Sequence, residues 1–118
     1  MSLDERIGKL RGQKSGLHGH DFLLTWEKSM ADLEIVLEVA TILKEMRLAG
    51  ISPRVFDSGL AISNFRDNST RTRFSFASAA NLLGLAVQDL DEEKSQIAHG
   101  ETVRETANMI SFISDFIG

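Results

Sequence analysis

The sequence predicts an α/β fold, built on a parallel sheet with βαβ crossovers. Two observations predict it. Segments with strand-like and helix-like apolar patterns alternate along the second half of the chain. In the whole chain, the helix-like segments that end near residues 49 and 83 are each followed by a glycine. Apolar residues make up 42% of the 118 residues, which is enough for the chain to form a core rather than stay disordered.

The first half of the chain predicts an arm followed by one long helix. Residues 1–20 are polar and rich in glycine, so we expect an arm or short helix that leads into a loose segment. Ser29 is a suitable N-cap, and apolar residues then recur at helical spacing as far as Ala49. Gly50 is expected to end this helix.

The second half predicts strands and helices in turn. The expected segments are a buried strand (59–65), a polar turn (66–68), a helix (69–83), a second strand (85–90), a polar loop (91–100), a helix (101–113) and the opening of a third strand (115–118). The helix over 69–83 should present Phe76 and Ala80 on one face. The helix over 101–113 should turn Val103, Ala107 and Ile110 inward.

Composition excludes several classes of protein. The absence of cysteine excludes a disulfide scaffold and a thiolate metal site. Thirteen Lys and Arg against seventeen Asp and Glu give a net charge of −4, which argues against a general nucleic-acid binder. His18 and His20 have no partners at metal-ligand spacing, so no metal is expected. The N-terminus has no apolar signal-peptide region and no apolar run is long enough for a membrane span, so we expect a cytoplasmic protein.

One segment, residues 65–76, predicts chemistry. It lies where a predicted strand leads into a helix, and open α/β sheets bind ligands at the carboxyl ends of their strands. The free backbone amides of a helix's first turn, together with the helix dipole, favour a phosphate there. Ser69, Thr70 and Thr72 add hydroxyl groups, and Arg71 adds a planar, charge-assisted donor.

The same segment leaves other interpretations open. Arg73 lies about 200° round the helix from Arg71, so we expect it to form a structural ion pair instead of sharing the same anion. Helix starts rich in Ser and Thr with arginines nearby are also common on surfaces that bind nothing. No glycine-rich phosphate loop is present, so mononucleotide or dinucleotide binding has little support.

Residues 69–73, followed by Phe74-Ser75-Phe76, closely resemble the carbamoyl-phosphate motif of aspartate and ornithine carbamoyltransferases. Downstream, Leu83-Gly84 and residues 100–107 resemble that family's Leu-Gly turn and the Gly-Glu-Thr/Ser start of its next helix. The resemblance covers most of the chain from about residue 21. The segments that look most like the family's YgeW-like branch are 20–27, 64–68 and 95–101.

This resemblance implies that the chain is the N-terminal portion of a carbamoyl-phosphate domain. The residues that match the family's phosphate-binding set are Ser69, Thr70, Arg71 and Thr72. The family residue matching Thr72 also reaches the carbamoyl oxygen. Arg71 and Thr72 are therefore the expected catalytic residues.

The resemblance also implies a trimer, in which a loop of the neighbouring subunit, here residues 91–100, completes each site. Gln96 matches the residue that reaches across in the ornithine-type pattern, and Ser95 matches a serine of the aspartate-type pattern. His99 stands where that second pattern has a lysine, and a neutral imidazole does not supply a lysine's charge. His99 is explained equally well as a loop residue that stabilises the turn before Gly100.

The implied activity is transfer of the carbamoyl group of carbamoyl phosphate to an amine acceptor, an amino acid or a related amino or amide compound, without a metal or cofactor. The alternative is a non-catalytic phosphate-binding, carbamoyl-phosphate-binding or regulatory module of the same fold. We divide the chain into an arm (1–20) and an incomplete carbamoyl-phosphate-binding domain (21–118). The acceptor-binding domain, the family's next arginine and its His-Pro-x-Gln segment are absent, so we expect this chain alone to be inactive.

Overall fold

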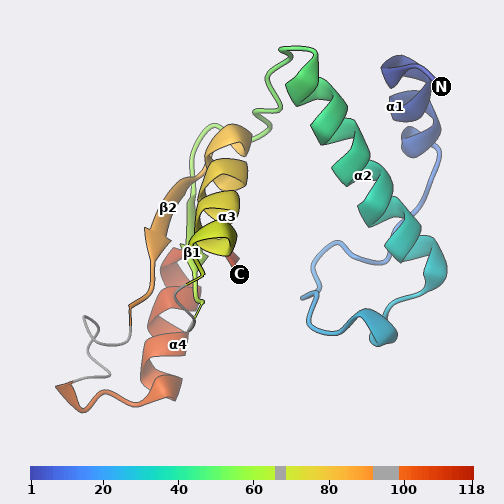
Figure 1. The fold of residues 1–118 in the computed structure, drawn as a ribbon. Helices are drawn as coiled ribbons and strands as arrows, with labels where there is room; N and C mark the ends of the chain where they lie inside the picture. The colour runs from blue at the N-terminus through green and yellow to red at the C-terminus, as the bar shows by residue number, and fades with distance from the viewer. Residues whose placement is uncertain (66–68, 92–98) are drawn as a thin grey trace. The chain divides into compact units, whose positions relative to one another are not determined.

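The computed structural model describes residues 1–65, 69–91 and 99–118. The chain folds into two compact units, Met1–Pro53 and Arg54–Gly118 (Figure 1). The division at residue 20 that the sequence suggested stays a prediction. Within the described ranges, no helix is both long enough and apolar enough to cross a membrane.

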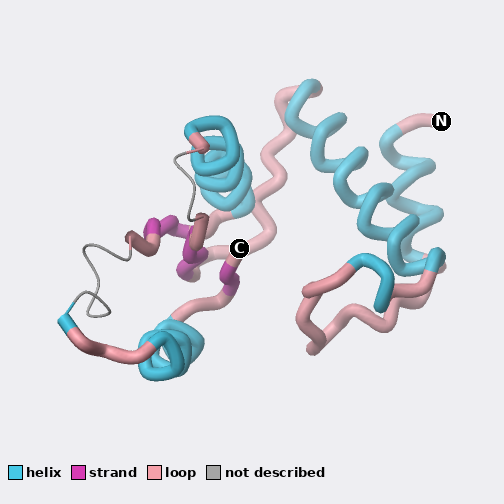
Figure 2. The backbone as a smooth tube through the Cα atoms, turned by 60° about the horizontal axis from the view of Figure 1, so that its bottom comes forward, coloured by secondary structure: helices cyan, strands magenta, loops and turns pink. Residues whose placement is uncertain are grey.

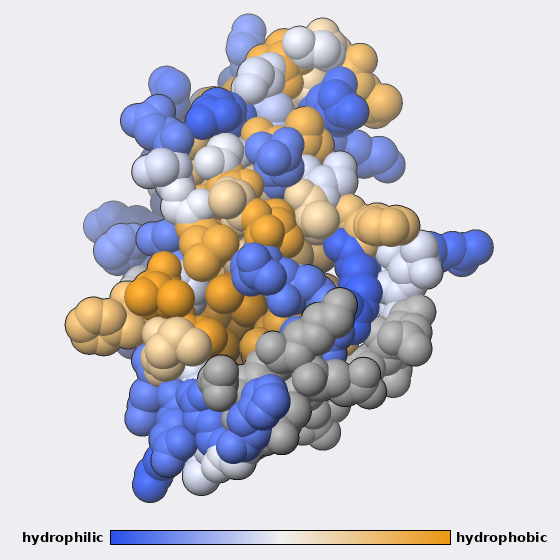
Figure 3. Space-filling view, turned by 90° about the vertical axis from the view of Figure 1, so that its left-hand side faces the viewer, coloured by the Kyte–Doolittle hydropathy of each residue, from blue (hydrophilic) through white to orange (hydrophobic). Residues whose placement is uncertain are grey.

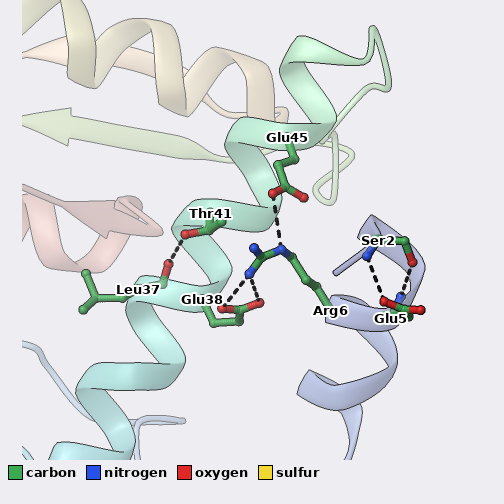
Figure 4. Close-up of polar contacts among 7 residues, drawn as sticks. All are labelled: Ser2, Glu5, Arg6, Leu37, Glu38, Thr41 and Glu45. Carbon is green, nitrogen blue, oxygen red and sulfur yellow. Dashed lines mark hydrogen bonds and ion pairs between the residues drawn. The ribbon is translucent and has the colours of Figure 1, made fainter.

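The first unit opens with a short helix, α1 (Leu3–Arg11), as the sequence allowed for the arm. Ser2 and Glu5 form a complete capping box at its start. The Ser2 hydroxyl accepts from the Glu5 amide at 3.2 Å, and the Glu5 carboxylate accepts from the Ser2 amide at 2.9 Å (Figure 4). Two amides that have no partner within the helix are satisfied in this way, which explains why a polar, glycine-containing segment is helical.

The long helix, α2 (Met30–Leu48), begins and ends close to the predicted positions. A 3-10 turn, η1 (Thr25–Glu27), precedes it. The Ser29 hydroxyl accepts from the amide of Asp32 at 3.1 Å, so the predicted N-cap is confirmed. Gly50 has a φ of +71° just beyond the helix, which is the conformation that a glycine provides after a helix end.

Arg6 joins α1 to α2 in the first unit. Its guanidinium donates to both carboxylate oxygens of Glu38, at 3.0 and 3.3 Å, and its Nε lies 3.2 Å from a carboxylate oxygen of Glu45 (Figure 4). The hydrogen bonds to Glu38 raise the pKa of Arg6, and the charges of Glu45 and Glu38 add to this effect against the opposing effect of burial. Arg6 is therefore a fixed positive charge between two acidic positions of α2.

The second unit contains a parallel three-stranded sheet, which confirms the predicted fold class. Its strands are β1 (Leu60–Ser63), β2 (Ala86–Asp89) and β3 (Phe116–Ile117). Their order is β2-β1-β3, and both pairings are parallel. Each strand lies inside the segment that the sequence predicted for it. Because β1 is central, its residues pair on both sides, and Ala61 is opposite Val87 and Phe116.

Two helices connect these strands. α3 (Thr70–Leu83) follows β1, and α4 (Val103–Ile113) follows β2. Figures 1 and 2 show α3 and α4 on opposite faces of the sheet. Gly84 ends α3 with a φ of +105°, as predicted. A helix on each face is the arrangement expected when a central parallel strand has neighbours on both sides.

The core of the second unit lies between α3 and the sheet. Ala61, Ala80 and Leu85 are buried, and Phe76 and Val87 pack against them. Ala61 is fully buried, at 0% exposure, and its small side chain allows Ala80 of α3 to approach the sheet. Phe76 also contacts the rings of Phe65 and Phe116, with centroids 5.7 and 5.8 Å apart. The predicted inward face of α3 is thereby confirmed.

The predicted inward face of α4 is partly wrong. Ile110 is buried as expected, but Val103 is 64% exposed and Ala107 is also exposed, whereas Thr106 is buried. Thr106 and Ile110 are four residues apart and form one stripe, from which Ala107 points about 100° away. Val103 belongs to the first turn, which lies beyond the ends of the strands in Figure 1.

Large apolar side chains remain at the surface of the second unit. Figure 3 shows apolar side chains, drawn in orange, at the surface. On α4, Phe112 is 92% exposed and Ile113 is 59% exposed, and on β3 Phe116 is 54% exposed. Apolar residues therefore occur on several sides of α4, so the sequence pattern alone could not identify the buried stripe.

We expect Gly84→Ala to destabilise the protein more than Gly50→Ala. Both glycines have positive φ, so alanine at either position is strained by about 1–2 kcal/mol. A Cβ at Gly84 would also overlap the backbone carbonyl of Phe56, whereas among the described residues no atom lies within 4 Å of a Cβ at Gly50. Urea denaturation of both variants measures the difference, and equal losses of stability would contradict the steric argument.

Candidate functional site

The candidate site lies at the edge of the sheet where β1 and β2 end. β1 ends at Ser63, its parallel neighbour β2 ends at Asp89, and α3 begins at Thr70. Residues 66–68, which connect β1 to α3, lie outside the described residues. The predicted segment therefore starts a helix at the carboxyl edge of the sheet, which is where open α/β sheets bind ligands.

The first turn of α3 lacks the side-chain cap that the other described α-helices have. Ser2, Ser29 and Thr102 each accept a hydrogen bond from an amide in the first turn of their own helix. Ser69 occupies the same position in α3 but makes no such bond, and its hydroxyl oxygen instead lies 2.8 Å from that of Thr72. The amides of this turn thus keep their capacity to bind an anion.

The other residues of this turn that are predicted to bind phosphate face solvent. Thr70, Arg71 and Thr72 are all exposed. In the part of the chain that the structure describes, no hydrogen bond or ion pair engages the guanidinium of Arg71. Its five N–H donors are consequently available to an incoming anion.

Arg73 makes the structural ion pair that the sequence predicted. One guanidinium nitrogen donates to the Oδ2 of Asp89, and the other donates to the carbonyl of Phe65 at 2.6 Å. The side chains of Arg73 and Asp89 are 29% and 40% exposed, so solvent partly screens the pair. Arg71 and Arg73 therefore differ in their contacts although only one residue separates them.

Sequence reasoning did not identify two polar members of the site, Ser63 and Asp89. The Ser63 hydroxyl is 2.6 Å from the Oδ1 of Asp89, and the two residues are register partners of β1 and β2. A signal for them exists in the sequence, because each is a polar residue close to the end of a predicted strand, within 59–65 or 85–90. It becomes informative only when the two strands are known to be adjacent.

The loop predicted to reach a neighbouring subunit is mostly beyond what the structure describes. Ser95 and Gln96 lie outside the described residues, and His99 is exposed just before Gly100. The described residues contain no group of three or more His, Cys, Asp or Glu side chains that could bind a metal ion. The roles expected of Ser95, Gln96 and His99 stay predictions.

Comparison with known proteins finds a family model that matches residues 20–118. Its description is aspartate/ornithine carbamoyltransferase, carbamoyl-P binding domain. The chain is 65% identical over 117 residues to YgeW of Escherichia coli (strain K12), a carbamoyltransferase by name, and the match covers 99% of this chain and 30% of that protein. It is 32% identical over 112 residues to the catabolic ornithine carbamoyltransferase of Treponema denticola, covering 94% of this chain and 33% of that protein.

Solved structures are similar as well. The aspartate transcarbamoylase of Trypanosoma cruzi, in complex with carbamoyl aspartate and phosphate, superposes with a TM-score of 0.77 at 27% identity. The match covers 86% of this chain and 33% of that chain. This chain thus spans about a third of the length of the relatives that it matches.

We expect Arg73→Ala to lower the free energy of unfolding by roughly 1–2 kcal/mol, because it removes a charged donor from Asp89 and from the Phe65 carbonyl. Arg71→Ala is the matched control, and its exposed position predicts a change within about 0.5 kcal/mol. Urea denaturation measures both. Similar values for the two variants would show that the Arg73 contacts contribute nothing to stability.

Proposed function

Because this chain belongs to the aspartate/ornithine carbamoyltransferase family and carries its carbamoyl-phosphate-binding domain, we propose that the first turn of α3 binds carbamoyl phosphate. The whole protein would then transfer the carbamoyl group to an amine acceptor. The observation that carries this proposal is a helix start without a side-chain cap, presenting Ser69, Thr70, Arg71 and Thr72 at the carboxyl edge of a parallel sheet.

The chemistry of these groups suits a phosphate ester. Backbone amides and hydroxyls donate to its oxygens, and Arg71 adds a bidentate, charge-assisted contact. The chain carries a net charge of −4, so its overall field does not attract an anion. Affinity for phosphate must therefore come from this local set of directed donors.

Carbamoyl transfer requires little chemistry from the protein beyond positioning and charge stabilisation. The amine nitrogen forms a bond to the carbonyl carbon, the bond from that carbon to the phosphate oxygen breaks, and the amine loses a proton as phosphate leaves. Negative charge develops on the carbonyl oxygen and on the departing phosphate. In this proposal the Thr72 hydroxyl donates to the carbonyl oxygen and Arg71 to the phosphate, where preorganised donors are most effective.

A trimer is the assembly that we propose, with residues of a neighbouring subunit completing each site. Gln96 is the first candidate for this role, followed by Ser95 and His99. The acceptor is an amine, and ornithine and aspartate in the names of the relatives support an amino acid or a related compound. A cytoplasmic role in amino-acid metabolism is part of the same proposal.

Arg71→Ala is expected to abolish binding of carbamoyl phosphate to the full-length protein, because no other described residue of this turn supplies a full positive charge free of an ion pair. Calorimetric titration with carbamoyl phosphate measures this. Arg47→Ala, which changes an exposed arginine in the last turn of α2, is the matched control and should retain wild-type affinity. Unchanged affinity in Arg71→Ala would refute the proposed site. Binding without turnover in the wild-type protein would favour the non-catalytic alternative.

The shared site is tested by mixing two inactive variants of the full-length protein, Arg71→Ala and Gln96→Ala. Dissociation and reassembly should restore about a quarter of the wild-type activity, because random assembly places an intact Arg71 beside an intact Gln96 at about one interface in four. Each variant reassembled alone is the control and should stay inactive. No recovery in the mixture, with trimers shown by light scattering, would mean that each subunit has a self-contained site.

A further inference from the structure

A chain of polar contacts connects three elements beside the candidate phosphate site. Ser63 at the end of β1 is 3% exposed, and its hydroxyl contacts the Oδ1 of Asp89 in β2 at 2.6 Å. The Oδ2 of Asp89 accepts from Arg73 of α3, and Arg73 also donates to the carbonyl of Phe65 at 2.6 Å. Both oxygens of the Asp89 carboxylate are engaged, one by a strand and one by the helix.

Backbone pairing determines where this carboxylate lies. Ser63 and Asp89 are register partners in the parallel pairing of β1 with β2, and the amide of Leu90 donates to the carbonyl of Ser63 at 2.8 Å. The backbone of Asp89 is therefore fixed on the sheet, and its side chain points in a fixed direction. Through Arg73 it ties the first turns of α3 to the ends of both strands.

The contacts from Ser63 through Asp89 to Arg73 form an anchor. This anchor determines how the rest of the first turn of α3 is oriented. Arg71 and Arg73 point about 200° apart on a helix, so holding Arg73 against the strands directs Arg71 away from them. The anchor also fixes the rotation of the turn whose amides lack a side-chain cap. We propose that Asp89, supported by Ser63, is a positioning residue for the anion site, acting through Arg73. This inference rests on the proposed function, because it assumes that the first turn of α3 binds phosphate.

Whether phosphate binding weakens or tightens when the charge of Asp89 is removed distinguishes a positioning role from simple electrostatic repulsion. A carboxylate near an anion site repels the anion, so removing its charge should strengthen binding if charge alone matters. If Asp89 acts by positioning, removing its charge should weaken binding, because the ion pair that orients the turn is lost. The two explanations therefore predict opposite results for the same substitution.

The test is Asp89→Asn in the full-length protein, titrated by calorimetry with inorganic phosphate and with carbamoyl phosphate. We expect roughly tenfold weaker binding of both ligands, because small displacements of preorganised donors are costly. Ser63→Ala leaves all charges in place and should weaken binding in the same direction by a smaller factor. In steady-state kinetics, the KM for carbamoyl phosphate should rise while the KM for the amine acceptor is unchanged.

Asp115→Asn is the matched control. The Oδ2 of Asp115 accepts from the amide of Leu60 at 2.9 Å, so this aspartate also supports β1, but at the opposite end of the strand from the site. The same substitution there should reduce stability without changing phosphate affinity. Circular dichroism establishes that each variant is folded at the temperature of the titration.

Each result decides between the possibilities. Unchanged or tighter phosphate binding by Asp89→Asn would overturn the positioning role and leave the proposed function in place. Equal losses of affinity in Asp89→Asn and Asp115→Asn would also overturn it, because they would reflect general destabilisation. Failure of the wild-type protein to bind either ligand would overturn the proposed function and this inference together.

Discussion

Parallel pairing of β1 with a neighbour on each side is the constraint on which the second unit depends. Strands that run in the same direction must be joined by crossovers, and here the crossovers contain α3 and α4. The same constraint collects the carboxyl ends of β1 and β2 at one edge, where α3 starts. Residues far apart in the sequence, such as Ser63 and Asp89, meet there because the register places them opposite each other.

The sequence predicts the elements well because local signals determine their ends. Ser29, Gly50 and Gly84 each lie at a helix end where the sequence placed them, since caps and positive φ depend on one or two residues. The buried side of α4 is different. Phe112 and Ile113 are strongly exposed although they are as apolar as the buried Ile110, so burial there depends on which stripe meets the sheet. Tertiary packing decides that, and an apolar pattern on several sides of a helix does not.

The candidate site likewise has some residues that the sequence predicts and others that depend on tertiary structure. Ser69, Thr70, Arg71 and Thr72 could be placed on a first turn because they are consecutive, and helix geometry separated Arg73 from Arg71. The partner of Arg73 could not be predicted, because Asp89 is 16 residues away and reaches it only through the pairing of two strands. Loop positions Ser95 and Gln96 rest on the family resemblance alone, since no local pattern fixes what a loop contacts.

In the proposed phosphate site, the pairing of Arg73 with Asp89 would also make an acidic chain selective for a small anion. Two unpaired arginines on one turn would attract many anions through charge, whatever their shape, and such attraction falls steeply with salt. With Arg73 engaged by Asp89 and the Phe65 carbonyl, Arg71 is the guanidinium among the described residues of this turn that stays open beside directed amides and hydroxyls. These donors favour binding of a tetrahedral group that can accept hydrogen bonds from several directions at once. Selectivity then comes from geometry, which is why the ion pair matters to the site although neither of its members needs to touch the ligand.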